Sequence, residues 1–401
     1  MMRTRRRCLR FIVTAALLLP VGAQTSASAA PATVEEAGLR PIPGSYIAVL
    51  RDDAGNREQV GAVVREITQR HRITARLLFA SALKGFSFQG NPRLAALIAA
   101  DRRVQSVQPD FEVRTRTVTG TQNSPPSWGL DRIDQRNLPL NSRYEFPNNG
   151  SGVNAYVIDS GIRATHREFG GRAVAAANFT PGGNTTDCNG HGTHVAGTVG
   201  GSNVGVAKAV RIVALKVLDC NGSGATSGIL AALDWVVQRG QRPAVVNMSL
   251  GHVGGDPALS KAIATVTGRG FSVVVAAGNN RIDACNVSPA QSSNVITVGA
   301  TNKQDSRDTQ YSNYGRCVNI FAPGTSINSA SPKANNTYQT MSGTSMASPH
   351  VAGAVALILS RSPGLSPRQV ADCLVEGAIH NQMANEGTGS PNRMLYVGAG
   401  C

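Results

Sequence analysis

Three short segments, far apart in the chain, each place one reactive side chain beside a glycine. Asp159 follows the apolar run 153–158, His191 lies within 189–197, and Ser345 follows a Gly-Thr pair. A serine hydroxyl is a poor nucleophile at neutral pH unless a base takes its proton. In Ser-His-Asp peptidases the histidine is that base and the aspartate holds the imidazole. We therefore expect acyl transfer catalysed by Asp159, His191 and Ser345.

A fourth segment, Ala276-Ala277-Gly278-Asn279, also follows an apolar run. A neutral Asn amide can bind the oxygen that becomes negative in the transition state of acyl transfer. The apolar period over 346–360 predicts a helix with Ser345 at its N-terminus, where backbone N–H groups lack helical partners. We expect an oxyanion hole made by the Asn279 side chain and the Ser345 backbone.

Each segment has a plainer interpretation when it is taken alone. Asp159 could be a turn residue after a strand, His191 a helix-cap histidine and Ser345 an ordinary N-cap. His191 and His194 could bind a metal, but the glutamate of an HExxH motif is missing. A lipase would need a Gly-x-Ser-x-Gly elbow and the order Ser, Asp, His. A non-enzymatic binding protein would need a lost triad member, and none is lost.

The elements that must position these residues follow from apolar periodicity. Beyond residue 127, short apolar runs typical of buried parallel strands occur at 153–158, 210–217, 244–248, 273–276 and 295–298. Helical patterns fall between them at 226–239 and 257–268. This alternation predicts an α/β fold, a doubly wound parallel sheet with helices on both faces. Asp159 and Asn279 would then lie at the carboxyl ends of strands, where such sheets carry their sites.

The first third of the chain predicts a separate small α+β domain at 31–113. Strand candidates at 45–50, 86–88 and 104–113 alternate with helical patterns at 58–72 and 92–100. A polar, threonine-rich linker is expected at 114–120, and a peptidase domain at 121–401. The domain at 31–113 would be a sheet with its helices on one face.

The extreme N-terminus predicts an export signal over 1–29. Five arginines precede the short apolar run 11–19, and Ala27-Ser28-Ala29 offers a cleavage site. The run is too short to cross a bilayer, so we expect a secreted protein with no membrane partner. No Lys/Arg run beyond the extreme N-terminus resembles a nucleic-acid patch, so we expect no nucleic-acid partner. We also expect a monomer. Of the formal net charge of +15, +9 lies in the first 120 residues. Export permits disulfides among the six later cysteines, and their spacing leaves fifteen connectivities open.

Residues 121–401 resemble the subtilase family, and within it the proteinase K branch with its aqualysin-like bacterial enzymes. The resemblance is carried by 127–134, 189–197, 217–224, 247–251 and 343–353. Residues 31–113 resemble the inhibitory propeptide of such enzymes, through 44–50 and 84–86. It implies a secreted serine endopeptidase that is made as a preproprotein and cuts itself near Gly120–Thr121. It also implies broad specificity, with apolar or aromatic side chains before the cut.

The resemblance also assigns further residues. Two edge strands would hold the substrate backbone by β-augmentation, formed by Gly222, Ser223 and Gly224 and by Ser249, Leu250 and Gly251. Ala276, Ala277 and Gly278 would wall the first specificity pocket. Thr226 stands where these enzymes often carry an aromatic residue. The implied disulfides are Cys188–Cys220 and Cys285–Cys317, with Cys373–Cys401 as a third pair.

Structural calcium is the only cofactor that the resemblance implies. One site would use Asp131, Asp134, Gln135 and Asn141. Hard oxygen ligands of this kind suit calcium. A second site would use backbone carbonyls near Ser293 and Val295, with Asn319 where a carboxylate is usual. The loss of that charge should weaken the second site, and a solvated polar loop remains the alternative at both.

Overall fold

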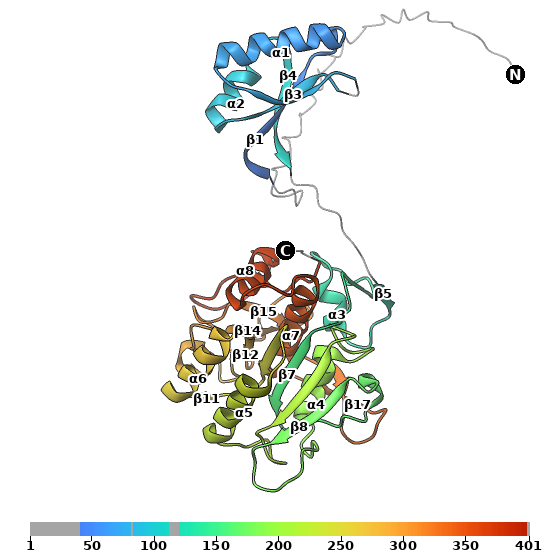
Figure 1. Cartoon of the computed structure of the whole chain (residues 1–401), viewed down its shortest axis with the longest axis vertical. Coiled ribbons are helices and arrows are strands. Elements are labelled where there is room, and N and C mark those ends of the chain that lie inside the picture. Colours follow the sequence, from blue (N-terminus) through green and yellow to red (C-terminus); the bar gives the residue numbers. More distant parts are fainter. Residues whose placement is uncertain (1–40, 82, 112–119, 399–401) are drawn as a thin grey trace, which may run out of the picture. The chain divides into compact units, whose positions relative to one another are not determined.

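The computed structural model describes residues 41–81, 83–111 and 120–398 (Figure 1). The chain divides into two compact units, Met1–Thr115 and Arg116–Cys401. The expected signal, residues 112–119 and Cys401 lie outside the described ranges. No helix within those ranges has both the length and the apolar character that a bilayer crossing requires.

The N-terminal unit is a four-stranded antiparallel sheet in the order β2-β3-β1-β4. Its strands are β1 (Pro41–Leu50), β2 (Ala75–Phe79), β3 (Gly85–Gln89) and β4 (Val104–Phe111). Helices α1 (Arg57–His71) and α2 (Pro92–Ala99) pack on it around a core that includes Phe86 and Ile98. Asn56 and Asn91 cap the two helices with their side chains, as the sequence favours.

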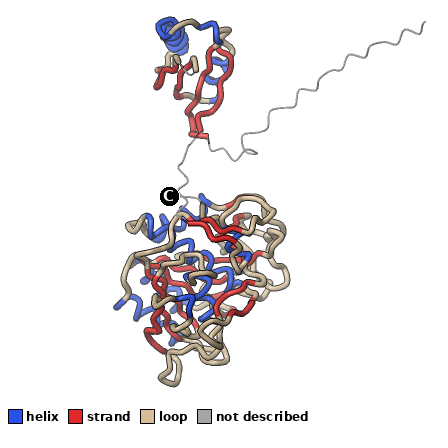
Figure 2. Tube along the Cα trace, turned by 90° about the vertical axis from the view of Figure 1, so that its right-hand side faces the viewer, coloured by secondary structure: helices blue, strands red, loops and turns tan. Residues whose placement is uncertain are grey.

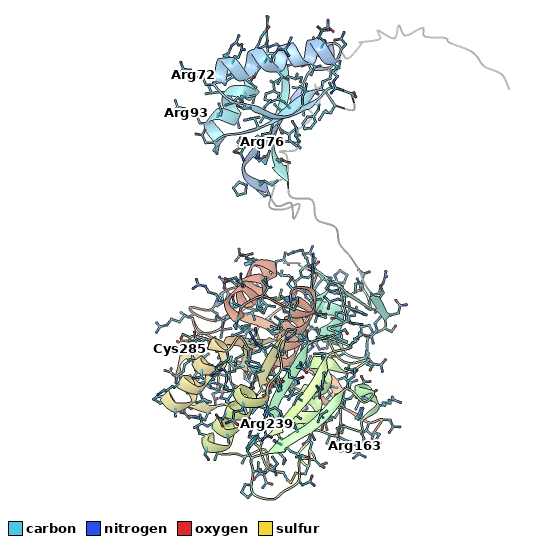
Figure 3. All side chains as sticks on the ribbon, viewed as in Figure 1. Arg72, Arg76, Arg93, Arg163, Arg239 and Cys285 are labelled. Carbon is cyan, nitrogen blue, oxygen red and sulfur yellow. A yellow bond between two sulfur atoms is a disulfide. The ribbon has the colours of Figure 1, made fainter. Side chains whose placement is uncertain are left out.

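Strand β2 was not predicted. It is an edge strand whose three central residues are exposed, so it lacks the apolar alternation that marks a half-buried strand. Leu77 and Leu78 on it are 63% and 44% exposed. Arg72, Arg76 and Arg93, labelled in Figure 3, are also exposed in this unit.

The C-terminal unit is built on a nine-stranded sheet in the order β18-β19-β15-β14-β12-β10-β7-β9-β8. All neighbouring strands are parallel except β18 and β19. The strands are β7 (Asn154–Asp159), β8 (Ala173–Asn178), β9 (Arg211–Lys216), β10 (Ala244–Met248), β12 (Ser272–Ala276), β14 (Ile296–Thr301), β15 (Ile320–Pro323), β18 (Ile379–His380) and β19 (Arg393–Met394). From β7 the chain adds β8 and β9 on one side and then β10, β12, β14 and β15 on the other, so the sheet is doubly wound.

Helices cover both faces of this sheet (Figure 1). On one face lie α4 (His191–Gly200), α7 (Thr344–Arg361) and α8 (Pro367–Gly377), which share one apolar core. The other face carries α5 (Thr226–Arg239) and α6 (Pro257–Gly268) over a second core. The predicted α/β class is confirmed.

The remaining strands form three antiparallel pairs outside the large sheet. They are β5 (Gly120–Asn123) with β6 (Arg143–Phe146), β11 (His252–Val253) with β13 (Val287–Ser288), and β16 (Ile327–Ala330) with β17 (Tyr338–Met341). Helix α3 (Trp128–Ile133) lies between β5 and β6 in the chain. Long loops join these elements (tan in Figure 2). The candidate catalytic residues lie where such loops meet strands or helices.

Candidate active site

Asp159 and His191 meet in a direct hydrogen bond. Asp159 is the last residue of β7 and His191 is the first residue of α4. Nδ1 of His191 lies 2.7 Å from Oδ1 of Asp159. The Asp159 side chain is 1% exposed and the His191 side chain 23% exposed, so the carboxylate is buried and the ring reaches the surface. The two residues that the sequence paired are brought together as a triad requires.

The pKa of His191 is raised by its surroundings. Burial opposes the charged imidazolium, but the Asp159 charge, the hydrogen bond to it and the nearby Asp187 charge outweigh burial. A carboxylate that stabilises the imidazolium makes the ring a stronger base, and this is what a general base in acyl transfer needs.

Asp187, which was not predicted from the sequence, holds the turn before His191. It is 4% exposed. Its Oδ1 accepts hydrogen bonds from the N–H groups of Asn189 and Gly190 and from the Ser160 hydroxyl, and its Oδ2 accepts two from Thr193. Gly190 has φ +108°, a conformation open mainly to glycine. The sequence offers only an acidic residue four positions before His191, which is not distinctive by itself.

Ser345 lies in the first turn of α7. Its hydroxyl donates a 3.1 Å hydrogen bond to the carbonyl oxygen of Ser249. No hydrogen bond joins Ser345 to His191 among the described residues. The Asp–His half of the expected hydrogen-bonded line is therefore present, while the serine hydroxyl points to another acceptor in this structure.

Asn279 follows β12 and is fixed by α7. Its Oδ1 accepts from both the backbone N–H and the hydroxyl of Thr344, each at 2.9 Å. With Oδ1 engaged, Nδ2 is the end of the amide that remains to donate. A Cβ built on Gly343 would lie 3.4 Å from Asn279 Nδ2 and 3.7 Å from Ser345 N. The two expected oxyanion donors thus lie close to one point beside Gly343.

A groove of about 540 Å³ opens beside His191. Its lining includes all six residues expected to hold substrate backbone: Gly222, Ser223, Gly224, Ser249, Leu250 and Gly251. Neither segment is a strand in the structure, which corrects the expectation of edge strands. The backbone groups of Gly224 and Leu250 have no hydrogen-bond partner within the described ranges, so a segment of this kind becomes a strand only when another chain pairs with it.

The three small residues expected to wall a first specificity pocket are mostly interior. Ala276 and Ala277 are 4% and 0% exposed, and only Gly278 reaches the surface in part. The groove beside His191 has an apolar floor from Leu218, Ile229 and Leu259, with Thr226 in its lining as well. The role given to 276–278 stays a prediction.

Two of the three expected disulfides are confirmed. Cys188 pairs with Cys220, and Cys285, labelled in Figure 3, pairs with Cys317. The first joins the segment before His191 to the segment before Gly222. Asn189 Nδ2 reinforces that link by donating to the Cys220 carbonyl at 3.1 Å. The third pair includes Cys401, outside the described part of the chain, and stays a prediction.

The two candidate calcium sites differ in how well they suit a cation. At the first, Asp131 and Asp134 are 5% and 3% exposed, and Gln135 Oε1 is buried without a hydrogen-bond partner. Asp131 also binds the backbone of the loop that contains Asn141. Asn141 Oδ1 accepts from the Arg143 N–H at 2.9 Å, so the carboxylates and Gln135 Oε1, not a free Asn141 oxygen, make this set the better match for calcium. Within the described ranges no group of three or more His, Cys, Asp or Glu side chains gathers as a metal site.

The second set does not suit a cation. Ser293, Val295 and Asn319 do line one cavity, but Arg368 lines it as well and no carboxylate does. Asn319 Oδ1 already accepts a 2.7 Å hydrogen bond from the Thr297 N–H. The alternative metal pair of His191 and His194 is also disfavoured, because His194 is buried and its Nε2 is bound to the Ile327 carbonyl.

Comparisons with known proteins agree with this geometry. The model of the subtilase family, peptidase S8, matches residues 150–398. The "Extracellular serine proteinase" of a Thermus species is 45% identical over 374 residues, 89% of this chain and 90% of that protein. "Subtilisin-like protease 7" of Arthroderma otae is 36% identical over 408 residues, 97% of this chain and 99% of that protein. A crystal structure of a cold adapted subtilisin-like serine proteinase matches with a TM-score of 0.65 and 50% identity, over 67% of this chain and 97% of that one. The chain belongs to the subtilase family of serine peptidases.

Proposed function

We propose that this chain is a secreted serine endopeptidase in which Ser345, His191 and Asp159 carry out acyl transfer. The observation that supports this most is the 2.7 Å Asp159–His191 hydrogen bond at the rim of the groove, with Ser345 hydrogen-bonded to a groove residue. Rotation of the Ser345 hydroxyl away from the Ser249 carbonyl would let His191 take its proton. His191 would then return that proton to the leaving amine.

The two N–H donors would stabilise the tetrahedral intermediate formed when the serine oxygen attacks the peptide carbonyl. Asn279 Nδ2 and the Ser345 backbone N–H would bind its oxyanion. Asp159 remains ionised and balances the charge of the imidazolium. Water then attacks the acyl-enzyme by the same steps, with His191 again acting as the base.

Substrate recognition would combine backbone pairing with apolar contact. The unpaired backbone of Gly224 and Leu250 would hydrogen-bond an extended peptide between the two groove segments. A side chain at Gly224 would collide with the Val217 carbonyl, so only glycine lets this groove segment pack against Val217. The apolar floor at Leu218, Ile229 and Leu259 favours apolar or aromatic substrate side chains.

The N-terminal unit would act as a propeptide that assists folding, covers the groove and is removed near Gly120–Thr121. Its exposed Leu77 and Leu78 on an edge strand supply an apolar surface of the kind that packs on a partner. A parallel sheet relies on non-local pairing and folds slowly, which gives a folding template a physical purpose. The extracellular relative in Thermus supports export of the product, and the mature enzyme would be a monomer.

Calcium, where it binds, would have a structural role at the first candidate site. Asp131, Asp134, Gln135 and Asn141 would contribute oxygen ligands, and the ion would tie α3 to the loop that leads into β6. No catalytic step uses it. Calcium removal should then lower thermal stability while the His191–Asp159 geometry stays intact.

The decisive experiment combines a fluorophosphonate probe with a casein cleavage assay. We expect labelling and cleavage in the wild type, and neither in Ser345→Ala. Ser360→Ala, which changes a serine on the same helix, is the matched control and should behave as the wild type. Ester turnover without casein cleavage would favour an esterase instead, and absence of labelling in the wild type would favour a non-enzymatic binding protein.

Self-processing needs a separate test with the same variant. The full-length Ser345→Ala chain, purified alone, should keep its N-terminal unit, because no nucleophile is present to cut near residue 120. Addition of active wild-type enzyme should then release the mature unit. Normal processing of the isolated variant would show that another protease does the cutting.

A further inference from the structure

The nucleophile helix contains a proline where it costs one helical hydrogen bond. Pro349 lies four residues after Ser345 inside α7. In an α-helix the carbonyl of residue 345 would accept from the N–H of residue 349, and proline has none. The Ser345 carbonyl therefore has no backbone partner of the usual kind. The Ser249 hydroxyl takes that place, with a 2.9 Å hydrogen bond to the Ser345 oxygen.

The contact between Ser249 and Ser345 is reciprocal. While the Ser249 hydroxyl donates to the Ser345 carbonyl, the Ser345 hydroxyl donates to the Ser249 carbonyl at 3.1 Å. Two residues that are 96 positions apart are thus joined by two hydrogen bonds. Ser249 lies in the groove segment 249–251, and Ser345 is the proposed nucleophile.

The Ser249 hydroxyl is itself oriented by a buried chain of side chains. Asn247 Nδ2 donates to Ser249 Oγ at 3.0 Å, and Asn247 Oδ1 accepts from the Ser348 hydroxyl at 2.7 Å. Asn247, Ser249 and Ser348 are 1%, 2% and 0% exposed. The chain begins and ends on α7, at Ser348 and Ser345, and passes through the carboxyl end of β10. Each side-chain nitrogen and oxygen in it makes at least one hydrogen bond, which fixes the order of the chain.

We propose that Asn247, Ser249 and Ser348 are positioning residues for the nucleophile. Their hydrogen bonds fix the first turn of α7 relative to the carboxyl end of β10. In that position the Ser345 hydroxyl would reach His191 and the Ser345 N–H would reach the oxyanion. The missing N–H of Pro349 makes this possible, because it leaves the Ser345 carbonyl available to a side chain from the substrate segment. The proposal rests on the proposed function, since it concerns how Ser345 is placed for acyl transfer.

The same contacts give the free enzyme a resting position for its nucleophile. The hydroxyl proton of Ser345 is held by the Ser249 carbonyl, on the backbone that would flank a bound peptide. The polar chain fixes the distance between these two groups. A misplacement of about 1 Å at a reacting group can cost about a hundredfold in rate, so loss of the chain should slow acylation.

The test uses three variants of the full chain: Ser249→Ala, Ser249→Thr and Ser348→Ala. A variant that does not process itself is matured with immobilised active enzyme. The first readout is the rate of labelling by a fluorophosphonate probe. The second is the split between kcat and KM on a peptide substrate, and the third is the urea unfolding midpoint. Thr297→Val is the matched control, since it removes a buried hydroxyl that donates to the Ala290 carbonyl at 2.8 Å, away from the site.

We expect Ser249→Ala to label about ten- to a hundredfold more slowly, mainly through kcat, with Ser249→Thr restoring most of the rate. Ser348→Ala should give a smaller loss, and it also tests the proposal if Ser249→Ala does not fold. Thr297→Val should lower the unfolding midpoint and leave labelling unchanged. If folded Ser249→Ala and Ser348→Ala are both labelled at the wild-type rate, the positioning role is overturned and the proposed function stands. A wild type that is not labelled would overturn the proposed function.

Discussion

Asp159 shows how one buried carboxylate can both anchor a strand end and orient a base. Its Oδ1 accepts from the Ser160 N–H at 2.7 Å and from His191 at 2.7 Å. The first contact fixes the carboxylate relative to β7, and the second passes that position on to the ring. Its charge, together with the hydrogen bond, also raises the pKa of His191 against the effect of burial.

The charge and the geometry of Asp159 can be separated by Asp159→Asn. The amide keeps the shape but loses the charge and favours the wrong tautomer of His191. We expect kcat to fall about 10⁴-fold, as for this substitution in another Ser-His-Asp peptidase. The pKa of His191 should fall as well, since the charge that raised it is gone, so the acid limb of kcat/KM should move to lower pH. A pH profile with an unmoved acid limb would contradict this.

Asn279 joins two roles that a second substitution can separate. Its Oδ1 caps α7 through Thr344, and its Nδ2 is the proposed oxyanion donor. Asn279→Asp keeps an acceptor for Thr344 and removes the donor, so kcat should fall by about 10²–10³-fold with the unfolding midpoint nearly unchanged. Asn279→Ala should lose both. Equal kcat in the wild type and Asn279→Asp would assign the residue to structure alone.

At the scale of the elements, the two disulfides can be compared directly, because they close loops of equal length. Cys188–Cys220 and Cys285–Cys317 both span 32 residues. In the chain-entropy model each should contribute about 3–4 kcal/mol to the free energy of unfolding. Only the first ties the His191 segment to the segment leading to Gly222.

Replacing each pair by serines should therefore lower stability by similar amounts, measured by urea unfolding in a Ser345→Ala background. In the active enzyme, loss of Cys188–Cys220 should raise KM several-fold because the groove segment is no longer tied to the segment before His191. Loss of Cys285–Cys317 should leave KM near the wild-type value. A larger rise in KM for the second pair would show that the groove depends on the other loop.

Some elements could be predicted to the residue and others could not, for physical reasons. The helices 226–239 and 257–268 have a clean apolar period and clear ends, at Gly240 and at Asp256 followed by proline. Strand β8 (Ala173–Asn178) was missed because its small, half-exposed residues carry little apolar signal. The substrate segments were predicted as strands because the resemblance describes them with a peptide bound.

Some residues of the candidate site could likewise be predicted from the sequence, and others could not. The Asp, His, Ser and Asn were predictable because glycines mark their turns and the chemistry limits the residue types. Asn247 and Ser348 were not, since their importance arises from a contact across 101 positions. Asp187 was not either, because its hydrogen bonds to the turn before His191 exist only once that turn has folded. Pro349, four residues beyond Ser345, was the one local sign that the Ser345 carbonyl needs a partner from elsewhere.

For the molecule as a whole, buried histidines oppose stability in acid. His194 and His350 are both fully buried on the α4–α7 face of the sheet. Burial lowers the pKa of each ring to about 4, against an ordinary value of 6.5, although hydrogen bonds to the Ile327 and Met346 carbonyls act the other way. Both rings are thus neutral in the folded unit at pH values where an unfolded chain would bind protons.

The folded state should therefore lose stability as the pH falls from about 6.5 towards 4. Each ring contributes up to about 1.4 kcal/mol per pH unit over that range. His191, whose pKa is raised, acts in the opposite direction only above about pH 6.5, so below that pH the slope is set by His194 and His350 together. Urea unfolding of the Ser345→Ala form at pH 7, 6 and 5 measures the slope without self-digestion. His350→Gln should flatten it, while His380→Gln, at an exposed position, should not. An unchanged slope in His350→Gln would place the acid sensitivity at other groups.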